Sequence, residues 1–92
     1  MTGYTLLRQI KLGPLHRPTR KTRHYQGGKE LSDPTELRII KYLDAPGYYL
    51  LYLDSQGVEL TDTYHETLES ALAQAEWEFQ VTPKEWEILE AP

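Results

Sequence analysis

The chain has no cysteine, and several other features that mark particular protein classes are also missing. Without cysteine it can form no disulfide, thiolate metal site or thiol nucleophile, and a cytoplasmic location is the default expectation. The longest apolar run, residues 48–53, is far too short to span a bilayer. Residues 1–15 lack the apolar stretch of an export signal. We therefore expect a cytoplasmic protein that does not enter a membrane.

The composition is that of an ordinary globular domain. Hydrophobic residues make up 39% of the chain and charged residues 26%, which matches neither disordered nor membrane proteins. A length of 92 residues is enough for one domain with a thin core. We expect a single α+β domain over residues 1–92.

Charge is divided sharply along the chain. Residues 1–29 contain seven Lys or Arg and no acid, whereas residues 30–92 contain three Lys or Arg and fourteen Asp or Glu. The two parts therefore stand at +7 and −11. The basic part could lie against the acidic part, against a second copy of the chain, or against nucleic acid.

Alternation predicts a first strand over residues 4–11, with Tyr4, Leu6 and Ile10 on one face. The following stretch, to about residue 36, is rich in Lys, Arg, Pro and Gly and has almost no apolar periodicity. A long loop of this composition is typically functional or disordered, and we expect a flexible basic loop over about residues 12–36.

Three strands in succession are predicted over residues 37–43, 48–54 and 58–64. The middle strand is apolar on both faces, which indicates a central strand or one whose second face packs on something else. In the third strand, the alternation places Val58, Leu60 and Tyr64 on its apolar side. Turns at residues 44–47 and 54–57 end in glycine, as left-handed turn positions favour.

A helix is predicted from Thr67, whose side chain can cap it. Its apolar stripe has helical spacing and contains Leu68, Ala71, Leu72, Ala75 and Phe79. Pro83 begins a short helical turn, and residues 86–89 form a last strand with Trp86 in the core. The order is strand, long loop, three-stranded meander, helix, strand. This predicts a small antiparallel sheet of four to five strands with one main helix packed on a face.

The face of this helix opposite the stripe contains Trp77, with Ser70, Ala73 and Gln74 around it. One interpretation is that the N-terminal loop or the last strand covers the indole ring. The other is that Trp77, Ala73, Ser70 and Gln74 form a protein-interaction patch, since tryptophan is a frequent anchor of interfaces.

The basic loop over residues 11–29 is the candidate nucleic-acid site. Flexible cations suit phosphate contacts, and an aromatic ring among them could stack on a base. The candidate residues are Arg17, Arg20, Lys21, Arg23 and Tyr25.

The three histidines do not have the spacing that presents two ligands to one metal ion. His65 could form an acid–base cluster with Asp62 and Glu66, although turn and helix-capping chemistry also explains these residues. We expect no metal, no cofactor and no catalytic residue.

Residues 47–80 read GYYLLYLDSQGVELTDTYHETLESALAQAEWEFQ. This segment, about a third of the chain, resembles a group of short bacterial proteins of unassigned function that share the pattern GYYLLYxD…TDTxHxTxxxA. It is also similar to antitoxin subunits of HicB type, whose helix starts Thr-x-Glu-Glu-Ala-Leu; Ser70 stands here at the second glutamate. The resemblance implies a small sheet with a helix, and a protein partner.

These observations favour a non-enzymatic protein-interaction module of bacterial origin: an adaptor, an antitoxin- or immunity-like protein, or a homodimer. The partner would be another protein or a second copy. The alternative is a nucleic-acid-binding protein that uses the loop of residues 11–29.

Overall fold

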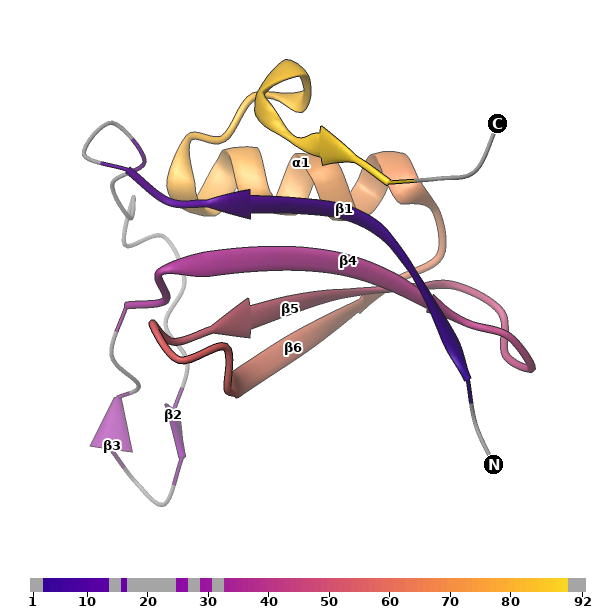
Figure 1. Cartoon of the computed structure of the whole chain (residues 1–92), viewed down its shortest axis with the longest axis horizontal. Helices are drawn as coiled ribbons and strands as arrows, with labels where there is room; N and C mark the ends of the chain where they lie inside the picture. The colour runs from indigo at the N-terminus through magenta and orange to yellow at the C-terminus, as the bar shows by residue number, and fades with distance from the viewer. Residues whose placement is uncertain (1–2, 14–15, 17–24, 27–28, 31–32, 90–92) are drawn as a thin grey trace.

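The computed structural model describes residues 3–13, 16, 25–26, 29–30 and 33–89 (Figure 1). A five-stranded antiparallel sheet has the order β6-β5-β4-β1-β7, and the helix α1 (Leu68–Phe79) packs on one of its faces. The strands are β1 (Tyr4–Lys11), β4 (Glu36–Tyr42), β5 (Tyr48–Leu53), β6 (Glu59–His65) and β7 (Glu87–Ile88). The predicted α+β fold, a small antiparallel sheet with one main helix, is confirmed.

A small hairpin lies between β1 and β4, where the sequence predicts only loop. Its strands are β2 (Tyr25–Gln26) and β3 (Lys29–Glu30), which pair antiparallel beside one end of the main sheet (Figure 1). Strands of two residues are too short to produce a periodicity, which is why the sequence does not reveal them. The predicted flexibility of the basic loop falls mostly on residues outside the described part of the chain.

A β-bulge divides β1 into two halves that present opposite faces. The register with β4 shifts between Leu6 and Arg8, so one extra residue is inserted in β1. Leu6 therefore packs on the sheet face away from α1, while Ile10 packs against the core beneath α1. The prediction that Tyr4, Leu6 and Ile10 share one face is wrong, because a bulge inverts the alternation.

Strand β5 is buried on both faces, as its sequence predicts. Leu50 and Tyr52 pack beneath α1, whereas Leu51 and Leu53 pack on the opposite side of the sheet. The strand lies between β4 and β6, and all four side chains are buried. The core beneath α1 consists of Leu37, Ile39, Leu50, Tyr52, Ala71, Ala75, Phe79, Val81 and Trp86.

Strand β6 turns its polar side, and not its apolar side, toward α1. Thr61 and Thr63 pair with the core residues Tyr52 and Leu50, so they lie on the helix side of the sheet. Val58 lies outside the strand and is exposed, and Tyr64 is on the opposite face. The expected assignment of the buried side is wrong, because the threonines are covered by the helix that follows directly in the chain.

The two ends of α1 are fixed by local hydrogen bonds. The Thr67 hydroxyl accepts from the Ser70 N–H at 3.1 Å, which confirms the predicted N-cap. At the C-terminus Gln80 adopts φ +61°, and its N–H donates to the Glu76 carbonyl at 2.9 Å. The predicted turn at Pro83 is a short 3₁₀ helix, η1 (Pro83–Glu85), and Trp86 beyond it is buried as expected.

Two glycines with positive φ close the hairpins on either side of β5. Gly47 has φ +84° and Gly57 has φ +79°, as the turn sequences predict. Gly47 is also buried under the ring of Tyr64, and a Cβ there would lie 2.3 Å from the ring. A Cβ at Gly57 would lie 4.0 Å from Arg38 Nη2, which is an ordinary van der Waals contact.

We expect Gly47→Ala to destabilise the fold more than Gly57→Ala. Backbone strain is common to both and costs about 1 kcal/mol, while the collision with Tyr64 adds about 1–3 kcal/mol at Gly47 alone. Chemical denaturation of the two variants measures the difference. Tyr64→Ala should remove the extra loss in a Gly47→Ala background, and equal losses at the two glycines would contradict the assigned contact.

Candidate interaction surfaces

The sheet face away from α1 carries a continuous set of tyrosine and aliphatic side chains. Paired residues of antiparallel strands share a face, and the pairings place these side chains together across β1, β4, β5 and β6. We call this set the tyrosine face; it consists of Tyr4, Leu6, Ile40, Tyr42, Tyr49 and Tyr64. Ile40 is buried within it, whereas Tyr4 is 58% and Tyr64 49% exposed.

The four tyrosine rings form an unbroken series across four strands. Ring centroids are 6.2 Å apart for Tyr4 and Tyr42, 5.3 Å for Tyr42 and Tyr49, and 5.3 Å for Tyr49 and Tyr64. The interplanar angles are 74°, 74° and 66°, so each pair meets edge to face. This arrangement is favourable for aromatic rings, and it holds a wide, rigid aromatic surface at a fixed orientation.

Charged residues of opposite sign border the tyrosine face on its two sides. Lys11 on β1 is exposed, and the Nε of Arg38 on β4 donates to the Glu36 carboxylate at 2.8 Å. On β6, Glu59 and Asp62 lie on the same face. The pKa of Glu59 is raised, first by partial burial and then by its hydrogen bond to Asp62 and by that residue's charge. Two acids therefore crowd one edge of the face.

The predicted interaction patch on α1 contains both exposed and half-buried residues. Trp77 is 43% exposed, and Ala73 and Ser70 are exposed with it on the outward side of α1. Gln74 is half-buried, and its Nε2 donates to Glu78 Oε1 at 3.0 Å. Trp77, Ala73 and Ser70 thus form the outer surface of the helix, while Gln74 contributes to the packing beneath it.

Glu78 is a buried acid that sequence reasoning missed. It is 3% exposed, and its Oε1 also accepts a hydrogen bond from the Tyr52 hydroxyl at 2.6 Å. Burial raises the pKa of Tyr52, and the adjoining carboxylate raises it further. Glu78 lies three residues after Ala75 of the apolar stripe. This helical spacing is the one sequence signal that places the acid near the core. The network joins α1 to the centre of the sheet.

His65 forms hydrogen bonds with Thr63 of β6 and Ser70 of α1, and not the predicted acid–base cluster with Asp62. Its Nε2 is 2.7 Å from Thr63 Oγ1, and its Nδ1 is 3.0 Å from Ser70 Oγ. Burial lowers the pKa of His65, which favours the neutral ring. Asp62 instead pairs with Glu59. Hydroxyl groups thus hold both ring nitrogens, and among the described residues none of the carboxylates is hydrogen-bonded to the imidazole.

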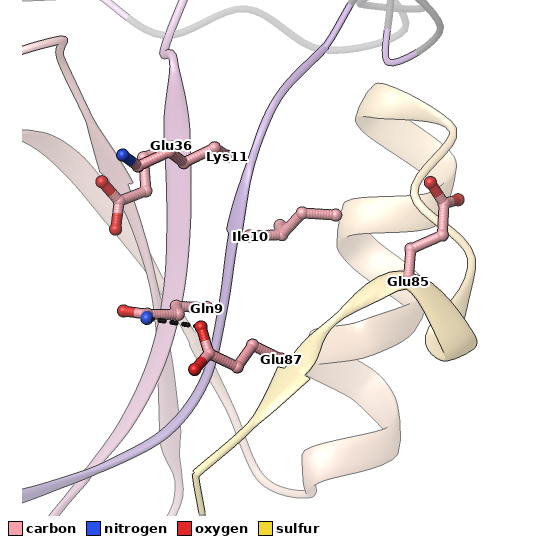
Figure 2. Close-up of a pocket in the computed structure, with 6 residues that line it drawn as sticks. All are labelled: Gln9, Ile10, Lys11, Glu36, Glu85 and Glu87. Carbon is pink, nitrogen blue, oxygen red and sulfur yellow. Dashed lines mark hydrogen bonds between the residues drawn. The ribbon is translucent and has the colours of Figure 1, made fainter.

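A cavity of about 250 Å³ lies beside the end of β1. In Figure 2 the carboxylates of Glu36 and Glu85 are on opposite sides of β1, and Gln9 Nε2 donates to Glu87 at 2.8 Å. The polar groups that line the cavity therefore do not point toward a common centre, which a catalytic or cation-binding arrangement would require.

Glu85 links the C-terminal segment to the residues that follow β1 through a hydrogen bond with His16. The His16 Nδ1 accepts from the Gly13 N–H at 2.9 Å, so the proton on Nε2 is directed at the Glu85 carboxylate. The Thr82 backbone N–H, then His16 and the Thr82 hydroxyl, lower the pKa of Glu85 to about 2.

The candidate nucleic-acid residues fall largely outside the described part of the chain. This holds for Arg17, Arg20, Lys21 and Arg23, while Tyr25 begins β2. Nucleic-acid binding by the loop of residues 11–29 therefore stays a prediction.

Comparisons with known proteins give no significant match, whether with family models, curated proteins or solved structures. The resemblance of residues 47–80 to short bacterial proteins and to antitoxin subunits stays a prediction. Within the described residues, no helix is long and apolar enough to cross a membrane, and no three His, Asp or Glu side chains gather as metal ligands would.

Removal of one hydroxyl group tests the buried network. Tyr52→Phe leaves the Glu78 carboxylate with one donor fewer in a dry site, and we expect a loss of about 1–3 kcal/mol in the free energy of unfolding. Tyr4→Phe removes the same group from an exposed ring and should change stability by only a few tenths of a kcal/mol. Denaturant titration compares the two, and equal, small changes would contradict the network's role.

Proposed function

We propose that this protein is a non-enzymatic protein-interaction module and that its tyrosine face is the docking surface. The observation that carries the proposal is the series of four edge-to-face tyrosines on the side of the sheet away from α1. Tyrosine is enriched at protein interfaces because it offers a large contact area with few rotatable bonds and a polar group at its tip.

The position of the face supports a protein partner. Its rings stand on paired strands, so they are held rigidly and lose little conformational freedom when they are covered. The acids of β6 lie at one border, which disfavours a polyanion such as nucleic acid at this surface. A face with a tyrosine and aliphatic centre and a charged rim has the usual anatomy of a protein interface.

The polar groups support a role without catalysis. The ring nitrogens of His65 are held by Thr63 and Ser70, and the buried Glu78 is engaged by Tyr52 and Gln74. These groups connect secondary-structure elements, so their chemistry is explained by the fold.

Site-specific photo-crosslinking in the cells that make the protein tests this proposal. A benzophenone amino acid at Tyr4 or at Tyr64 should yield a covalent adduct with another polypeptide, because both rings stand at the proposed interface. The same group at Gln56, an exposed turn residue, is the matched control and should yield none.

A third position separates the two candidate surfaces. Adducts at Trp77 without adducts at Tyr4 or Tyr64 would place the interface on the outer side of α1 and contradict the tyrosine face. Absence of adducts at all three positions would contradict the interaction module itself.

A further inference from the structure

The tyrosine face carries a cation, Lys11, at its β1 side and acids at its β6 side, so two copies of the face can bring opposite charges together. Residues that pair across β1, β4, β5 and β6 form rows of four side chains on this face. One row contains Lys11, Glu36, Leu53 and Glu59. The next row runs from Gln9 through Arg38 and Leu51 to Asp62. Lys11 thus lies on β1, Arg38 is paired with Glu36 on β4, and two crowded acids lie on β6.

We propose that the occupant of the tyrosine face is a second copy of this chain, packed face to face about a two-fold axis that runs along the strands between β4 and β5. The inference rests on the proposed function and names its partner. Sheets that pack face to face keep their strands within about 30° of each other, so such an axis lays each row over the same row of the partner in reverse order.

The reversal brings unlike groups into contact. Strand β6 lies over β1 of the other copy, so Glu59 faces Lys11 and Asp62 faces Gln9 across the interface. The mutual repulsion of the two acids in one chain is then relieved by a cation from the other.

The apolar row is compatible with the same axis. This row runs from Leu6 through Ile40 and Tyr49 to Tyr64. In reverse order it places Tyr64 over Leu6 and Tyr49 over Ile40 of the second copy. Tyr64 then meets Leu6 of the other copy at each end of the row, and Tyr49 stands over the buried Ile40 nearer its centre.

Charge reversal in two separate variants, followed by mixing, tests the arrangement. One variant carries Glu59→Lys with Asp62→Lys, and the other carries Lys11→Glu. Each places like charges across its own homodimer, and we expect each to weaken self-association about tenfold or more at low salt. In an equimolar mixture both contacts again join opposite charges, so the heterodimer should regain the affinity of the natural chain.

Sedimentation velocity measures all four samples, and thermal melts of the variants check that they fold. The inference is overturned if the natural chain is monomeric up to roughly 1 mM, if the single reversals leave its dimer unchanged, or if the mixture stays monomeric. Its failure is distinct from that of the proposed function: a monomeric chain that still crosslinks to a different protein through Tyr4 and Tyr64 keeps the docking surface and loses only the second copy.

Discussion

The organising constraint of this structure is that β5 is apolar on both faces, while α1 packs on only one face of the sheet. The face beneath α1 forms the main core around Leu50 and Tyr52. The other face buries Leu51 and Leu53 but leaves Tyr4 and Tyr64 half exposed above it. A domain of this size has a small core, and an aromatic surface that stays exposed to water contributes nothing to it. We therefore assign the second face to a partner.

The helix is held to the sheet by more than apolar packing. Ala71 and Ala75 allow a close approach, and the hydrogen bonds from Tyr52 and Gln74 to Glu78 fix its position along the strands. These bonds are made in a dry site, where loss of a partner is costly, so they specify one docking of the helix. The opposite face keeps its geometry because the sheet beneath it is rigid.

The sequence predicts what depends on local pattern. The strand positions, the two-sided β5, the Thr67 cap and the burial of Trp86 follow from alternation, capping chemistry and helical spacing. It does not reveal the bulge at Leu7, because one inserted residue changes the facing of a strand without changing its composition.

The candidate site depends on relations between strands that the sequence does not contain. Tyr4, Tyr42, Tyr49 and Tyr64 meet only through the pairing of β1, β4, β5 and β6, so the sequence does not reveal them as one set. Glu78 is similar: its spacing from Ala75 places it near the core, but the Tyr52 hydroxyl that makes its burial tolerable comes from a distant strand.

An isotope-filtered NOE measurement on a mixture of labelled and unlabelled chains tests the face-to-face dimer most directly. Such a spectrum reports only contacts between different copies. We expect NOEs from the Tyr64 ring to the Leu6 methyl groups and from the Tyr49 ring to those of Ile40. Intermolecular NOEs confined to Trp77, or no intermolecular NOE in a dimeric sample at these four residues, would contradict the face-to-face dimer.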